Sequence, residues 1–137
     1  MTPDQLADLS ARAYRHMVPW TAAQFAETLA LPRSLLAHTE HAFVLGQVIA
    51  GEAEILALAT DPDHQRGGEA TQALARFHDA ARMRDATQVF LEVSVENSAA
   101  IAFYTRHGYA PTGQRKGYYS TPQGHRADAV IMVRMLP

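Results

Sequence analysis

Residues 56–77 read LALATDPDHQRGGEATQALARF, and this stretch decides the fold. It opens with a short apolar run that ends at an Asp-Pro pair, which is typical of a buried strand. After the two glycines, Ala70, Leu74 and Phe77 recur at helical spacing, which predicts an amphipathic helix. The sequence therefore predicts a strand, a basic loop containing glycines and a helix in direct succession.

The loop between this strand and this helix has the properties of an anion-binding site. A helix start carries unpaired N–H groups and the positive end of the helix dipole. Gly67 and Gly68 let an anion approach that backbone closely. The pattern fits a phosphate site, and it also fits a plain strand-to-helix turn. It is neither a P-loop nor a dinucleotide fingerprint, because no Lys-Ser/Thr follows the glycines and three spaced glycines are absent.

Composition narrows the class of protein. The 137 residues are 47% hydrophobic, which predicts a single globular domain over residues 1–137. No apolar run approaches the roughly 20 residues that cross a bilayer, so we expect no membrane partner. The formal charge of -2 argues against direct binding of nucleic acid.

The residue types also bear on compartment and metal binding. The chain has no cysteine, which excludes disulfides and thiolate metal sites and is typical of a cytoplasmic protein. No signal peptide is visible at the N-terminus. His38 and His41 are three residues apart, but no third ligand accompanies them. We therefore expect a cytoplasmic protein without a metal ion.

Two capping boxes predict two helices in the N-terminal part of the chain. Thr2 begins a helix that we expect to run to Pro19, and Thr21 begins one that ends before Pro32. Trp20 stands directly before the second cap. It either packs on the following helix as a hydrophobic staple or lines a substrate pocket.

Residues 43–50 and 52–60 are typical of two antiparallel strands joined by a tight turn at Gly51. Glu52 and Glu54 alternate with apolar residues, so they share one face of their strand. They are either solvated edge residues or a place that attracts an ammonium group.

Residues 87–95 form the next predicted strand. Its apolar odd positions, from Val89 to Val95, face one side, and Glu92 faces the other. Glu92 is either exposed at the sheet surface or a carboxylate that points into a wet cleft and acts as a base.

A helix over residues 98–107 is predicted next, with Asn97 as its N-cap. Tyr104 on this helix either packs in the core or gives a proton to a basic leaving group. Two closing strands follow, and Tyr118 and Tyr119 lie in the connection between them. These tyrosines suit either packing or the wall of a peptide groove. The closing strands are residues 109–117 and 127–135.

The ordered motifs resemble those of the GNAT acetyltransferases over nearly the whole chain. Gln65 to Ala70 matches the acetyl-CoA pyrophosphate pattern of that family, Gln/Arg-x-x-Gly-x-Gly/Ala. More narrowly, the chain resembles the ribosomal-protein alanine N-acetyltransferases. The matching stretches are residues 19–20, 52–56, 65–70, 91–93, 97–104, 108–109 and 115–119.

This resemblance implies a GNAT fold of the α/β (α+β) class, with a mixed, splayed central sheet flanked by helices. It implies acetyl-CoA as the cosubstrate, held between the central strand and the strand of Glu92, and no metal. The implied cofactor contacts are Leu58, Ala59, Thr60, Gln65, Arg66, Gly67, Gly68, Glu69, Ala70, Thr71, Asn97, Ala100 and Tyr104.

The resemblance also implies roles in catalysis. Glu92 would act as the base and Tyr104 as the acid, while Trp20, Tyr118 and Tyr119 would contact a peptide. The acceptor would be a protein N-terminus such as that of a ribosomal protein. A small-molecule amine as acceptor and a catalytically silent acyl-CoA-binding module stay open as alternatives.

Two residues depart from the family pattern. Glu69 carries a charge where an apolar residue is usual, and its side chain can point to solvent if only its backbone N–H faces the ligand. Gly117 stands where the subgroup commonly has asparagine, which affects the expected substrate contacts.

Overall fold

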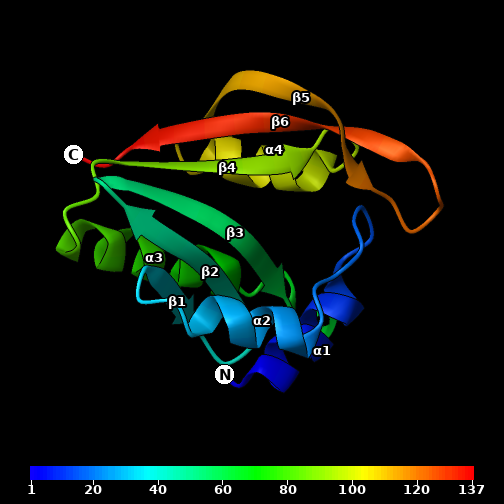
Figure 1. Cartoon of the computed structure of the whole chain (residues 1–137), viewed down its shortest axis with the longest axis horizontal. Helices are drawn as coiled ribbons and strands as arrows, with labels where there is room; N and C mark the ends of the chain where they lie inside the picture. Colours follow the sequence, from blue (N-terminus) through cyan, green and yellow to red (C-terminus); the bar gives the residue numbers. More distant parts are fainter.

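A six-stranded mixed sheet in the order β1-β2-β3-β4-β6-β5 organises the computed structural model, which describes all 137 residues (Figure 1). The predicted fold class, a mixed sheet flanked by helices, is confirmed. No helix is long and apolar enough to cross a membrane. The elements are α1 (Pro3–Ala13), α2 (Ala22–Leu29), β1 (Ser34–His38), β2 (Ala42–Ile49), β3 (Glu52–Thr60), a 3₁₀ turn (Pro62–His64), α3 (Glu69–Met83), β4 (Gln88–Ser94), α4 (Ser98–Arg106), β5 (Ala110–Ser120) and β6 (Arg126–Met135).

Helices cover both faces of the sheet. Helices α1 and α2 lie on one face and α3 and α4 on the other (Figure 1). On the first face, Phe25 packs with Phe43 in a cluster of seven buried residues. On the second face, Leu74 and Phe77 belong to a cluster of 18. Each fully buried apolar side chain of this size contributes about 1.5–3 kcal/mol, so both faces anchor the central strands.

The sheet splays between β3 and β4, as the family resemblance implies. These strands pair in parallel only from Glu52 with Gln88 to Ile55 with Leu91, and the rest of β3 has no partner on that side. Figure 1 shows the two strands diverging beyond this point. The edge of β3 that faces β4 is therefore open at its C-terminal end.

A β-bulge lies where the splay begins. Leu45 pairs with Ala57 and Gly46 pairs with Ile55, so Leu56 is an extra residue on β3. A bulge bends its strand and increases the local twist, which turns the end of β3 away from β4. It also changes the face to which the side chains point, because Ile55 belongs to the cluster under α3 and Ala57 to the one under α1 and α2.

The first helix is shorter than the sequence predicts. Helix α1 ends at Ala13, and Tyr14 is its C-cap in an extended conformation, well before Pro19. The apolar face of α1 buries Leu6 and Leu9, and the helix ends one turn after Leu9. Residues 14–21 therefore form a connection over the end of β3, where a continued helix was expected.

One strand was missed and two predictions about strands are wrong. Strand β1 was not predicted, because its short alternation of Leu35 and Ala37 becomes regular only when paired with β2. Val95 lies outside β4 and is 39% exposed. Tyr118 and Tyr119 lie within β5, which continues past an irregularity between Arg115 and Tyr119.

Candidate active site

The start of α3 differs from the starts of the other α-helices. Helices α1, α2 and α4 are capped by the side chains of Thr2, Thr21 and Asn97. Helix α3 begins after Gly68, which provides no side-chain cap. Gly68 has φ +81°, a left-handed conformation that glycine adopts without strain. The N–H groups of the first turn of α3 are therefore left to an external acceptor, which suits a diphosphate.

Glu69 does not point to solvent, and that prediction is wrong. Its Oε1 accepts from the hydroxyl of Thr39 at 2.7 Å and from the N–H of His41 at 2.9 Å. Its Oε2 lies 2.7 Å from Nδ1 of His41. These donors, the Thr39 hydroxyl above all, lower the pKa of Glu69. The carboxylate is thus held by the β1–β2 connection, and the backbone of the loop before α3 remains free for an anion.

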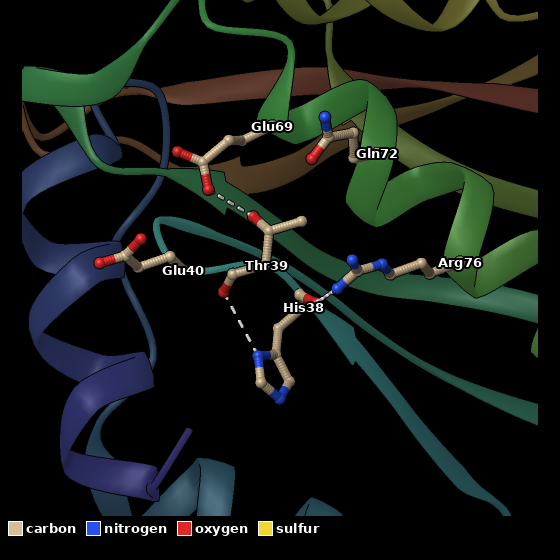
Figure 2. Close-up of a pocket in the computed structure, with 6 residues that line it drawn as sticks. All are labelled: His38, Thr39, Glu40, Glu69, Gln72 and Arg76. Carbon is tan, nitrogen blue, oxygen red and sulfur yellow. Dashed lines mark hydrogen bonds between the residues drawn. The ribbon is translucent and has the colours of Figure 1, made fainter.

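A polar cavity of about 450 Å³ lies beside this anchor, between α3 and the β1–β2 connection (Figure 2). Figure 2 shows Glu69 directed at Thr39, and the Arg76 guanidinium bonded to the carbonyl of His38 at 2.7 Å. The cavity is lined by His38, Thr39, Glu40, Glu69, Gln72 and Arg76. It contains none of the predicted catalytic residues.

Glu92 lies on β4 directly after Leu91, the last residue that pairs with β3. Its side chain is only 10% exposed, so the alternative of an exposed residue on the sheet surface is wrong. The β5–β6 hairpin accounts for this burial, since the hydroxyl of Tyr119 donates to the Glu92 carbonyl at 2.8 Å. Arg115 Nε lies 2.9 Å from Glu92 Oε1, whereas the buried Oε2 has no hydrogen-bond partner.

Tyr104 lies on α4, belongs to the cluster of 18 buried residues on the α3 face of the sheet and is 6% exposed. Burial raises its pKa well above 10, and the neighbouring phenols of Tyr14, Tyr109 and Tyr119 act in the same direction. Tyr104 therefore stays protonated over the whole working range of pH. The Glu92 carboxylate and the Tyr104 phenol thus both lie near Tyr119. The carboxylate can serve as a base and the phenol as an acid.

Residues 41–109 match the acetyltransferase (GNAT) family. The chain belongs to the GNAT family of acetyltransferases. The predictions of an acyltransferase and of this family are confirmed, and the family implies acetyl-CoA as the cosubstrate.

Individual GNAT relatives agree with this assignment. The ribosomal protein bS18 alanine N-acetyltransferase of Escherichia coli is 35% identical over 121 residues, which cover 85% of this chain and 81% of that protein. The Salmonella typhimurium protein of the same name is 41% identical over 91 residues, 66% of this chain and 61% of that protein. The crystal structure of the Escherichia coli enzyme superposes with a TM-score of 0.86 at 32% identity, covering 98% of this chain and 87% of that one.

The other residues implied by the GNAT resemblance fall into three places. Leu58, Ala59 and Thr60 lie on the open part of β3. The Asn97 side chain accepts from the N–H of Ala100 at 3.1 Å, so its oxygen caps α4. The remaining predicted cofactor contacts lie in the loop and first turn of α3: Gln65, Arg66, Gly67, Gly68, Glu69, Ala70 and Thr71.

The three predicted peptide contacts differ in their surroundings. Trp20 packs on Phe25 with ring centroids 5.3 Å apart, which confirms the hydrophobic staple, and it is only partly buried, so it can also contact a peptide. Tyr118 is 47% exposed, and its ring lies 5.4 Å from the Arg115 guanidinium carbon. Tyr119 is more buried and bonds the backbone of Glu92. Of the three, Tyr118 is the most accessible to a peptide.

Sequence reasoning did not single out Tyr14, Arg115 or the burial of Glu54 as parts of this GNAT site. Tyr14 leaves the end of α1 so that its hydroxyl lies near the backbone of Leu58, and burial raises its pKa to about 12. The alternative of a solvated edge residue is wrong for Glu54, because β3 is a central strand. Burial raises the pKa of Glu54, and Gln47 donates to its carboxylate at 2.9 Å.

No three side chains of the metal-ligating types are grouped to hold a metal ion. The expectation that the reaction needs no metal stays a prediction.

Proposed function

We propose that this chain transfers the acetyl group of acetyl-CoA to the α-amine of a protein N-terminus, with an N-terminal alanine of a ribosomal protein as the acceptor. The relatives at 35% and 41% identity carry the name of that activity. The observation that carries the proposal is the largely buried carboxylate of Glu92, which lies directly after the last pair of β4 with β3, where the splay begins.

The cosubstrate would occupy the opening and the uncapped helix start. The free N–H groups from Arg66 to Thr71 would receive the diphosphate, and Gln65 and Arg66 would add polar side chains. The pantetheine arm would lie along Leu58 to Thr60, whose edge has lost β4 as a partner. The held carboxylate of Glu69 supports this arrangement, because it keeps a negative charge away from the diphosphate.

The acceptor must lose a proton before it attacks. An α-amine has a pKa near 8 and a lysine amine one near 10.4, so deprotonation at pH 7 costs roughly 1 and roughly 5 kcal/mol respectively. A single carboxylate such as Glu92 is sufficient as the base for an α-amine, whose deprotonation costs only roughly 1 kcal/mol. The site is therefore better suited to an N-terminus than to a lysine side chain.

The proton balance uses both candidate residues. Glu92, directly or through a water, takes one proton from the ammonium group and passes it to solvent. The amine nitrogen then bonds to the thioester carbonyl carbon, while a backbone N–H of the open part of β3 stabilises the oxygen. The nitrogen loses its second proton by the same route. The carbon–sulfur bond breaks, and Tyr104 gives a proton to the sulfur and regains one from solvent.

Tyr118 and Tyr119 lie on β5 next to the Glu92 carboxylate. Trp20 lies at the end of the α1–α2 connection and packs on Phe25 of α2. These aromatic side chains are the proposed contacts of the first residues of the peptide. Asn97 would orient the cosubstrate or a water with the amide nitrogen that its capping role leaves free.

Transfer of labelled acetyl groups to short peptides that differ only at the first residue tests this proposal. We expect the peptide that starts with alanine to be the preferred substrate, and polyamines and aminoglycosides to be poor acceptors. Preferred transfer to a small amine would favour the small-molecule alternative. Binding of acetyl-CoA without transfer to any amine would favour the silent acyl-CoA-binding module.

A further inference from the structure

The two carboxylate oxygens of Glu92 have different surroundings. Oε1 lies 2.9 Å from Arg115 Nε, and Oε2 is buried without a partner. A buried carboxylate without a countercharge is strongly disfavoured, by several kcal/mol. Arg115 is the cation that compensates Glu92, and it does so through only one of the two oxygens.

Arg115 is held by the irregular part of β5. Its guanidinium carbon lies 5.4 Å from the Tyr118 ring centroid. Just beyond it, the N–H of Gly117 donates to Asp128 Oδ1 at 2.8 Å, and Arg126 Nε donates to the Gly117 carbonyl at 2.8 Å. These contacts on both sides of Gly117 fix the local shape of the strand. The guanidinium is therefore directed at Glu92 by ordered backbone although its side chain is 57% exposed.

Every element packed around Glu92 contributes to its electrostatic surroundings. Strand β3 contributes Glu54, which shares the face of Glu92 and is influenced by both Glu92 and Arg115. Strand β5 contributes Arg115, Tyr118 and Tyr119. Tyr119 connects this group to Tyr104 on α4 and to Tyr14 just after α1. Strand β6 contributes Ile131 opposite Glu92 and Asp128 bound to Gly117.

Glu54, Glu92 and Arg115, which influence one another, do not balance in charge without a substrate. Glu54 and Glu92 bring two carboxylates, and Arg115 brings one guanidinium. One negative charge is left over, which matches the single positive charge of an N-terminal ammonium group. The site is therefore complementary to the charged form of the acceptor, and Oε2 is the oxygen that no protein donor satisfies.

We propose that Arg115 is a positioning residue that holds the carboxylate of Glu92 through Oε1 in the orientation in which Glu92 acts as the base. This inference rests on the proposed function, because it assigns to Glu92 the role of base. Arg115 does not contact the reacting atoms.

The loss of kcat and its rescue by a conservative variant test this role. Without the guanidinium, nothing holds Oε1, so the carboxylate of Glu92 is no longer fixed in one orientation. For Arg115→Gln we expect kcat to fall about ten-fold or more, the low side of general acid–base effects. Arg115→Lys keeps the positive charge and should recover most of this loss.

The neighbouring Lys116 provides the matched control. Lys116→Gln removes one positive charge from the adjacent exposed position of the same strand, and we expect its kcat to equal that of the wild type. Calorimetric titration should give the same Kd for acetyl-CoA in Arg115→Gln and wild type. Thermal melting of each variant checks the fold. A wild-type kcat in Arg115→Gln, or a loss that Arg115→Lys does not recover, would overturn the inference.

A double-mutant cycle separates this inference from the proposed function. If Arg115 acts through Glu92, the variant carrying Glu92→Gln and Arg115→Gln has the same kcat as Glu92→Gln alone. An additional loss in the double variant would refute the positioning role and leave the base in place. An unchanged kcat in Glu92→Gln itself would remove Glu92 as the base and the inference with it.

Discussion

Glu92 and Tyr104, the proposed base and acid, have different surroundings. Arg115 Nε lies 2.9 Å from Glu92 Oε1, and burial keeps the proton on Tyr104. Glu92→Gln and Tyr104→Phe should therefore each lower kcat at least about ten-fold, the low side of general acid–base effects. Steady-state rates of the purified variants, with acetyl-CoA binding as a control, measure this. Wild-type turnover in either variant would remove that residue's role.

The raised pKa of Tyr104 gives a second prediction at this scale. An acid is active while protonated, and burial moves the loss of the Tyr104 proton well above pH 10. No alkaline fall in kcat should therefore arise from Tyr104 below about pH 10, the ordinary pKa of tyrosine. Comparing the kcat profiles of wild type and Tyr104→Phe checks this. An alkaline limb below pH 10 that is present in the wild type and absent in the variant would contradict it.

At the scale of elements, a substitution at the uncapped start of α3 distinguishes an effect on acetyl-CoA binding from an effect on folding stability. Gly68 and Gly124 both have positive φ, and an added Cβ meets nothing within 4 Å at either position. Alanine at either site should cost about 1–2 kcal/mol of folding free energy, the strain of a left-handed residue. Only Gly68→Ala should also weaken acetyl-CoA binding, because Gly124 lies in the β5–β6 turn. Chemical denaturation and calorimetry measure the two effects, and equal affinities in both variants would refute the anion site.

The bulge of β3 depends on a second glycine. A Cβ at Gly46 would lie 2.6 Å from the Phe77 ring and would overlap the carbonyl of Glu54. Gly46→Ala should therefore destabilise the fold by about 1–3 kcal/mol or more through overpacking. Gly113→Ala is the control, since its Cβ would make an ordinary contact of 3.6 Å with Ile131. Urea unfolding of both variants decides the point, and equal midpoints would show that the close approach at the bulge can relax.

The sequence predicts well the elements that local hydrogen bonds determine. It predicts poorly the elements that depend on contacts between distant parts of the chain. The capping boxes of Thr2 and Thr21 and the Asn97 cap satisfy backbone groups within one turn, so the pattern alone predicts them. The early end of α1 at Ala13 and the strand β1 depend on packing against other elements. No local pattern encodes them.

The same distinction holds for the candidate site. Glu92 and Tyr104 were predicted through family motifs, and their chain positions follow from those motifs. The burial of Glu92 and its pairing with Arg115 depend on the β5–β6 hairpin folding across β4, which joins residues far apart in the chain. The position of Glu69 likewise depends on a contact with His41 that no spacing rule indicates.

At the scale of the whole molecule, His78 links the packing of α3 to acid stability. It is 4% exposed, its Nε2 lies 2.7 Å from the Tyr109 hydroxyl, and burial above all lowers its pKa to about 4. The unfolded chain, with a histidine pKa near 6.5, then binds more protons than the folded one between these values. The stability that His78 contributes is present above pH 6.5 and is lost as the pH falls towards 4. Thermal melting of wild type and His78→Gln from pH 8 to 4 should show a smaller acid loss in the variant, and equal losses would contradict this assignment.

The position of the transferred acetyl group tests the central claim most directly, because the site is suited to an α-amine beside an activated thioester. A peptide with an N-terminal alanine and an internal lysine, incubated with acetyl-CoA and the protein, can be sequenced by tandem mass spectrometry. The account predicts acetylation of the α-nitrogen alone. Acetylation of the lysine, or no acetylated peptide from protein that binds acetyl-CoA, would contradict it.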